Sequence, residues 1–213
     1  MHLPADAAPT ALAWAGHLAS WPLVVLAARG ADWGSLRRPG VTHLWPGACV
    51  LVLVLWQIRA EVAGLPAVHL LGATLLTLVV GWRSAVVGLV VVAVADRLFR
   101  GGDWPALGLD LMVGVIVPVV VSEGVRRLTI RSLPRQPFAW ILLSGFAGGG
   151  LAAAAACLTQ VAVAALGGLA PVGPVLVGGA LLVFPEAFVT GALVAWMVAF
   201  YPHLLGGLGV RPL

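Results

Sequence analysis

Residues 172–200 read VGPVLVGGALLVFPEAFVTGALVAWMVAF, a run in which the only charged side chain is Glu186. A helix needs about 20 apolar residues to cross the hydrocarbon core of a bilayer. Outward from this run, charges, prolines and glycines divide the chain into six further apolar stretches: residues 10–28, 42–58, 68–80, 84–98, 107–125 and 138–166. The sequence therefore predicts an all-α, polytopic membrane protein of about seven transmembrane helices, with 68–80 and 84–98 as a tight hairpin.

The composition agrees with a membrane protein and argues against several functional classes. Of 213 residues, 61% are hydrophobic and 9% are charged, whereas soluble proteins carry roughly 25% charged residues. We therefore expect no nucleic-acid surface. HExxH, GxSxG, Walker A and EF-hand patterns are absent, and no nucleophile–base pair can be assembled, so we expect no enzymatic activity. Cys49 and Cys157 form no CxxC pair and are expected to be small buried hydrophobes.

The arginines predict the orientation, because all 12 basic residues are arginines. With the N-terminus outside, three of them fall in outer loops, at Arg59, Arg97 and Arg100, and nine fall on the inner side. The inner set comprises Arg29, Arg37, Arg38, Arg83, Arg126, Arg127, Arg131, Arg135 and Arg211. The positive-inside rule then places the C-terminus in the cytoplasm of a bacterium, with the chain in its cytoplasmic membrane. We expect one transmembrane domain over residues 1–213: an extracellular segment (1–9), a helix bundle (10–200) and a cytoplasmic tail (201–213).

The first two residues form a candidate metal site. Met1 and His2 offer three nitrogens from one dipeptide: the free amine, the His2 amide once deprotonated, and the imidazole. His69, which the predicted topology places on the same outer face, would supply a fourth nitrogen. Square-planar nitrogen coordination selects Ni(II) or Cu(II), and Co(II) accepts similar ligands. Because these ligands must lose protons, binding is expected to weaken below about pH 7.

Three carboxyl groups lie within the predicted spans, where charges are costly and are functional candidates by default. Asp110, near the outer end of its helix, either faces a site or lies at the membrane interface. Glu123 is four residues before Arg127, which predicts a structural ion pair. Glu186 follows Pro185, and it is either a hydrogen-bonded helix-packing group or part of a translocation path.

Small residues and the remaining histidines favour packing roles. Ala11, Ala15 and Ala19 recur at i, i+4 and form a smooth strip that suits either packing within the chain or docking of a partner. The glycines and alanines of residues 145–156 favour close helix packing. The remaining histidines, His17, His43 and His203, have no ligand-spaced neighbour and are expected to be packing or interfacial residues.

Four short blocks occur in order along the chain: Met1-His2-Leu3-Pro4, His69-Leu70-Leu71-Gly72-Ala73, Ala106-Leu107-Gly108-Leu109-Asp110 and Pro185-Glu186-Ala187, and the last helix ends Tyr201-Pro202-His203-Leu204. Taken together, these blocks resemble the cobalt/nickel CbiM/NikM family, the substrate-capturing S components of energy-coupling factor transporters. That family opens Met-His-Ile-Pro, and its later blocks read Gly-His-Leu-Leu-Gly-Gly, Ala-Leu-Gly-Ala-Asn and Gly-Glu-Gly.

The resemblance implies a seven-helix protein whose N-terminus folds back into the bundle. The metal, Ni(II) or Co(II), would be held there by the Met1 amine, the His2 amide nitrogen and imidazole, and the His69 imidazole. The implied partners are a transmembrane coupling subunit, cytoplasmic ATPases and a small accessory membrane subunit. Two departures stand out: Leu65-Pro66-Ala67-Val68 replaces the family's Gly-Thr-Ser-Gly, and Asp110 replaces its Asn. A divergent metal, Cu(II) included, is therefore compatible with the sequence.

Three functional hypotheses follow. The first is the capture subunit of an ATP-driven metal uptake system. The second is a metal carrier or channel that works without ATPases, with Asp110, Glu123 and Glu186 relaying ions. The third is a membrane factor that supplies metal, copper included, to a metalloenzyme. Uptake by the protein alone would favour the second, and co-purification with a metalloenzyme but no ATPase would favour the third.

Overall fold

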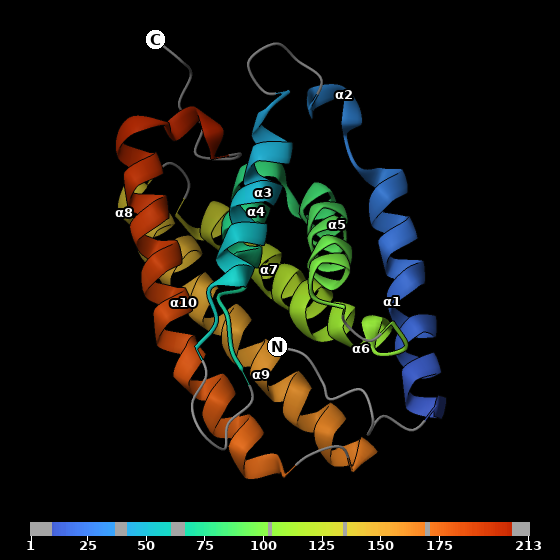
Figure 1. Ribbon diagram of the computed structural model, residues 1–213. Helices are drawn as coiled ribbons and strands as arrows, with labels where there is room; N and C mark the ends of the chain where they lie inside the picture. The colour runs from blue at the N-terminus through green and yellow to red at the C-terminus, as the bar shows by residue number, and fades with distance from the viewer. Residues whose placement is uncertain are drawn as a thin grey trace.

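The apolar runs of the sequence fold into a bundle of helices, shown in the computed structural model in Figure 1. The structure describes residues 10–36, 42–60, 67–101, 104–133, 136–168 and 171–205. Met1 and His2 lie outside these residues. Within them there is no β-strand, and a single isolated β-bridge joins Ala60 to Val68.

The helices follow the apolar stretches in chain order. The first half contains α1 (Thr10–Gly30), α2 (Trp33–Leu36), α3 (Leu44–Gln57), α4 (Ala73–Val80) and α5 (Trp82–Arg100). The second half contains two long continuous helices with internal π-helical turns. They are α6 (Leu107–Leu111), η2 (Met112–Ile116) and α7 (Val117–Ser132), then α8 (Pro137–Ala139), η3 (Trp140–Ala147) and α9 (Gly148–Gly167). Finally, α10 (Val172–Phe200) is followed by the short η4 (Pro202–Leu204).

The predicted all-α fold and the number of helices are confirmed. Seven helical segments of eight or more residues occur in the described part of the chain, one for each predicted stretch. Four of them are long and apolar enough to cross a membrane: Ala11–Gly30, Leu107–Ser132, Pro137–Gly167 and Val172–Phe200. The others are shorter or, in the case of α5, carry charges near the end. The orientation in the membrane stays a prediction.

Helix α4, which corresponds to the predicted stretch 68–80, is much shorter than that stretch. It begins only at Ala73 and is 8 residues long, so it rises about 12 Å, less than half of a hydrocarbon core of about 30 Å. The preceding residues 67–71 run as extended backbone instead, and Gly72, in the left-handed conformation, turns the chain into the helix. Such backbone is tolerated at membrane depth only where protein surrounds it and completes its hydrogen bonds. Apolar periodicity cannot reveal such a half-helix, because buried extended chain is equally apolar.

The short helix α4 lies at the centre of the bundle. It contacts α3, α5, α7, α9, α10 and η3, and the side chains from Ala73 to Leu78 are all buried. Long helices α9 and α10 pack against each other along much of their length. An added Cβ at Gly149 would lie 3.1 Å from the Glu186 carbonyl oxygen, so the glycines of α9 permit the close packing that the sequence predicts.

Helix α1 packs along α5 and α6 at one side of the bundle (Figure 1). It crosses α6 with the two backbones in contact, since an added Cβ at Gly16 would lie 2.7 Å from the Leu109 nitrogen. The alanine strip Ala11, Ala15 and Ala19 lies on the exposed side of α1. The strip therefore takes no part in packing within the described chain.

Candidate metal site

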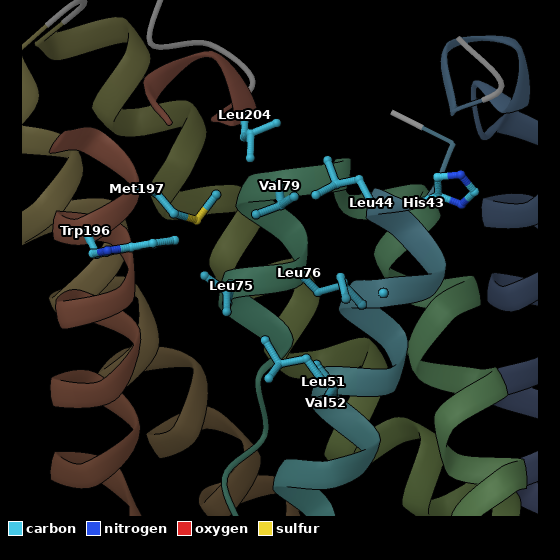
Figure 2. A pocket seen from close by; sticks show the side chains of 12 residues that line it. His43, Leu44, Leu51, Val52, Leu75, Leu76, Val79, Trp196, Met197 and Leu204 are labelled. Carbon is cyan, nitrogen blue, oxygen red and sulfur yellow. The ribbon is translucent and has the colours of Figure 1, made fainter. Parts of the chain in front are cut away.

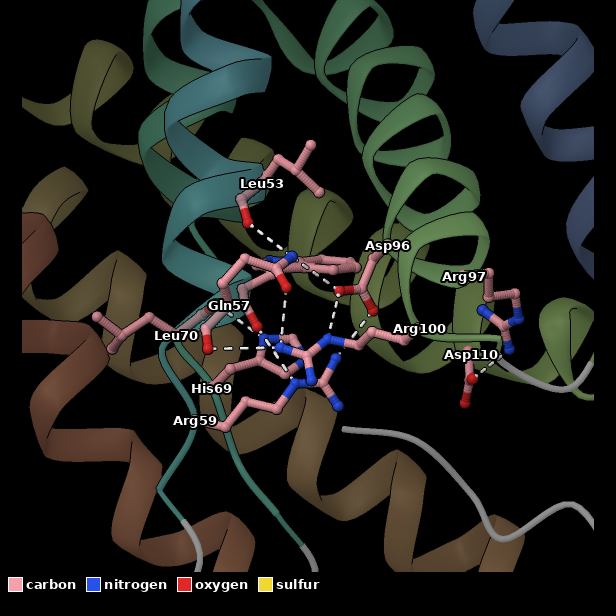
Figure 3. Close-up of polar contacts among 10 residues, drawn as sticks. Leu53, Gln57, Arg59, His69, Leu70, Asp96, Arg97, Arg100 and Asp110 are labelled. Carbon is pink, nitrogen blue, oxygen red and sulfur yellow. Dashed lines mark hydrogen bonds and ion pairs between the residues drawn. The ribbon is translucent and has the colours of Figure 1, made fainter.

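His69 lies in the extended segment just before α4, and the surrounding contacts hold its ring in one orientation (Figure 3). The residue is 3% exposed. Its ring packs on the indole of Trp56 with the centroids 4.7 Å apart. The His69 Nδ1 lies 3.0 Å from the Leu70 carbonyl oxygen. A carbonyl oxygen can only accept, so Nδ1 carries the proton and Nε2 keeps the lone pair that a metal would bind.

The backbone on both sides of His69 is also fixed by hydrogen bonds. Before it, Ala60 and Val68 exchange two backbone bonds of 2.8 and 3.1 Å. After it, the Trp56 Nε1 donates to the Leu71 carbonyl oxygen at 3.1 Å. The Leu71 and Gly72 N–H groups both donate to Glu186, at 2.7 and 2.9 Å. The extended segment thus meets the requirement that backbone polar groups away from water be paired.

Glu186 reaches this segment from the middle of α10. It is 2% exposed, and its two carboxyl oxygens accept one bond each from the start of the α4 half-helix. Of the two roles left open by the sequence, these contacts correspond to the hydrogen-bonded packing group. Its partners, however, are N–H groups more than 100 residues away in the chain, not the carbonyls released by Pro185. Proximity in sequence could not have predicted this.

A charged cluster that the sequence analysis did not single out lies beside His69 (Figure 3). Its centre is Asp96 of α5, whose side chain is 1% exposed. Arg59 pairs with Asp96 at 2.8 Å, Arg100 at 3.1 Å, and the Gln57 amide donates to it at 3.0 Å. The i, i+4 spacing of Asp96 and Arg100 was the available signal for this pair. The cluster ties the end of α3 to the end of α5.

Asp110 belongs to a second buried ion pair. Its Oδ2 lies 2.6 Å from Nη2 of Arg97, and the side chains are 6% and 3% exposed. Arg97, expected in an outer loop, instead lies within α5, which continues to Arg100. Figure 3 shows the pair apart from the cluster around Asp96. The structure thus gives Asp110 a charge partner in α5.

Glu123 forms the ion pair that its spacing predicts, and a second one as well. Its carboxylate accepts from Arg127 at 2.7 Å and from Arg126 at 2.7 and 2.9 Å. The Arg127 side chain is 56% exposed, so this group lies at the edge of the bundle. The expectation of a structural ion pair is confirmed.

The other predicted packing residues lie away from His69. Trp21 Nε1 donates to His17 Nδ1 at 3.0 Å, and His17 Nε2 lies 3.1 Å from the Pro105 carbonyl oxygen, so the imidazole links α1 to the start of α6. Cys49 and Cys157 are free and buried, as expected.

His43 lies at the edge of a pocket of about 260 Å³ near the far end of α4 (Figure 2). That pocket is otherwise apolar, with side chains from α3, α4, α10 and η4.

A complete set of metal ligands is not gathered within the described ranges, where no three His, Cys, Asp or Glu side chains come together. The predicted set does not require such a group, because three of its four nitrogens belong to Met1 and His2, outside those ranges. What the described part of the chain contributes is one buried, oriented imidazole.

Residues 2–204 match the CbiM family, described as the cobalt uptake substrate-specific transmembrane region. The chain belongs to the CbiM family. The resemblance drawn from the sequence blocks is therefore confirmed. As a member of the CbiM family, the chain is a multi-pass membrane component of transition-metal uptake, and its role is transport, not catalysis. No curated protein sequence matches it significantly.

Two solved structures share the fold of this CbiM family member. One, described as a truncated transition metal transporter, is 17% identical with a TM-score of 0.75, and the match covers 95% of this chain and 99% of that one. The other, described as a transition metal transporter, is 19% identical with a TM-score of 0.73, and 92% of each chain is covered. The helix arrangement is thus that of known metal transporters.

Proposed function

We propose that this protein is the substrate-capturing membrane component of an energy-coupling factor transporter that takes up Ni(II) or Co(II). The metal is captured at the outer face by the Met1 amine, the His2 amide nitrogen and imidazole, and Nε2 of His69. The observation that carries the proposal is the orientation of His69. The bond from Nδ1 to Leu70 leaves Nε2 as the donor atom, and this is the tautomer that a metal-binding imidazole needs.

The contacts of the buried carboxyl groups weigh against an ATP-independent carrier or channel. Asp110 is paired with Arg97, and Glu123 with Arg126 and Arg127. A relay needs groups that exchange protons or bind ions in turn. A carboxylate held by an arginine in a buried pair is a poor relay group, because protonating it would leave the arginine charge uncompensated.

Energy for uptake is expected from partner subunits: a transmembrane coupling subunit, cytoplasmic ATPases and a small accessory membrane protein. The exposed face of α1 supports this expectation. Ala11, Ala15 and Ala19 form a smooth strip on the outer side of the bundle, and small residues allow another helix to approach closely in a membrane. The third hypothesis, a factor that supplies a metalloenzyme, predicts no ATPase in the purified complex.

Metal binding by purified protein with a native N-terminus tests the assignment. Titration with Ni(II) and with Co(II) should show tight binding that His2→Ala, His69→Ala or one extra residue before Met1 each abolishes. The extra residue displaces the amine from the chelate ring and leaves every side chain in place. His203→Ala is the matched control and should bind as the wild type does. Tight binding that survives all three changes would overturn the ligand set.

A further inference from the structure

The Glu186 carboxyl group accepts hydrogen bonds from two backbone N–H groups. Its Oε2 accepts from Leu71 at 2.7 Å and its Oε1 from Gly72 at 2.9 Å. Those two N–H groups immediately follow the His69-Leu70 pair and precede the first residue of α4. One side chain of α10 therefore holds the junction between the extended segment and the half-helix.

We propose that Glu186 is a positioning residue for metal capture, which sets the place and orientation of His69 by binding the Leu71 and Gly72 N–H groups. The inference rests on the proposed function, in which His69 is a metal ligand. Glu186 itself does not coordinate the metal.

The start of α4 needs such a group for a physical reason. The first N–H groups of a helix, from the N-cap onward, have no partner within it; the Gly72 N–H at the N-cap of α4 is one of them, and the Leu71 N–H lies just before it. Each unpaired buried N–H costs about 1–3 kcal/mol. Here no capping side chain precedes the helix, because the residue at that position is Gly72, with φ of 67°. A carboxyl group at this end of a helix is also attracted by the helix dipole. Glu186 meets both requirements from another helix.

The position of Glu186 is itself held rigidly. An added Cβ at Gly149 of α9 would lie 3.1 Å from the Glu186 carbonyl oxygen, so the two helix backbones are in close contact there. On the opposite side of the segment, Trp56 both donates to the Leu71 carbonyl oxygen and packs on the His69 ring. The segment is therefore clamped between α3 and α10. A ligand placed in this way loses little conformational freedom when metal binds.

Glutamate suits this position and glutamine does not. Both carboxyl oxygens are acceptors, which matches two N–H donors. In Glu186→Gln one oxygen becomes an NH2 group, so a donor would face the Leu71 or Gly72 N–H. One hydrogen bond is lost and the segment must shift, although the size of the side chain is unchanged. Substitution of groups that orient a metal ligand typically weakens metal binding by about 10–100-fold.

The test is Ni(II) titration of E186Q, with absorption spectra of the metal-loaded protein. We expect the dissociation constant to rise by about 10–100-fold and, at saturating Ni(II), the ligand-field band to move to longer wavelength, since a misplaced fourth nitrogen weakens the ligand field. A general loss of packing would not produce that spectral change. Glu123→Gln, the same substitution at another buried carboxyl group, is the matched control and should leave both quantities unchanged.

The outcomes separate this inference from the proposed function. If wild-type protein binds neither Ni(II) nor Co(II), or if His69→Ala binds as the wild type does, the proposed function fails. If binding depends on His69 but E186Q keeps the wild-type affinity and spectrum, only the positioning role is overturned. If E186Q does not fold, hydrogen–deuterium exchange of residues 67–72 in the metal-free wild type tests whether the contacts from Glu186 hold this segment in place. Slow exchange supports the positioning role of Glu186, and exchange as fast as in an exposed loop refutes it.

Discussion

At the scale of single residues, a buried ion pair links two neighbouring helices of the bundle. Arg97 and Asp110 lie 2.6 Å apart with side chains 3% and 6% exposed, and they join α5 to α6. Removing one member of a buried pair leaves an uncompensated charge, which costs about 3–5 kcal/mol. The pair therefore contributes strongly to the relative placement of the two helices.

We expect Arg97→Met to lower the free energy of unfolding by about 3–5 kcal/mol, because the Asp110 carboxylate would remain buried without its cation. The double variant Arg97→Met/Asp110→Leu should recover most of this loss. Arg127→Met is the control, since that side chain is 56% exposed and surface pairs contribute about 0–1 kcal/mol. Thermal melting in detergent measures all three. Equal melting temperatures for Arg97→Met and Arg127→Met would contradict the assigned role.

At the scale of elements, close contact between backbones determines how α1 attaches to the bundle. An added Cβ at Gly108 of α6 would overlap the backbone nitrogen of His17 in α1. Gly114 lies in the same continuous helix, and a Cβ there would meet nothing within 4 Å. The two glycines therefore separate the effect of a side chain at the crossing from its effect on the helix itself.

Gly108→Ala should destabilise the protein by about 1–3 kcal/mol or more, because the added methyl group forces α1 away from α6. Gly114→Ala should be neutral or stabilise it by up to about 1 kcal/mol, since alanine favours the helix over glycine. Melting of both variants under one condition gives the comparison. The interpretation of the crossing would be wrong if Gly108→Ala melted at or above the temperature of Gly114→Ala.

At the scale of the whole molecule, the arginines predict which end of the bundle faces the cytoplasm. The continuous helix Leu107–Ser132 is long enough to cross the membrane, and Trp104 and Leu133 flank its two ends with exposed fractions of 47% and 43%. The arginine distribution places Trp104 outside and Leu133 inside. The His69 segment follows the C-terminal end of α3, which is tied to the C-terminal end of α5 by the Arg59–Asp96 and Arg100–Gln57 contacts. Since the chain leaves that end of α5 toward Trp104, the segment and Trp104 are placed on the same side of the bundle.

Labelling of single cysteines tests this orientation. In a background with Cys49→Ala and Cys157→Ala, a membrane-impermeant maleimide added to intact cells should modify Trp104→Cys and spare Leu133→Cys. Broken cells should show labelling of both, which controls for reactivity. The reverse pattern in intact cells would invert the topology and move the metal site to the cytoplasmic side.

Local patterns in the sequence were enough to predict the helical membrane class, the number and order of the helices, and the Glu123–Arg127 pair. These features depend on local properties: the length of apolar runs, and side chains three or four residues apart on one helix. The blocks around His69 and Glu186 also led to the family. For the metal site, however, the sequence could name only the residue types and could not show how His69 is held.

The three-dimensional fold was needed to show that the stretch 68–80 is an extended segment followed by a half-helix, and that Glu186 binds this segment from α10. It also assigned Asp110 to Arg97 and revealed the cluster around Asp96. Each of these depends on groups from different helices meeting in the bundle interior. There a buried polar group must find a partner wherever the fold supplies one, and distance along the chain gives no sign of which partner that is.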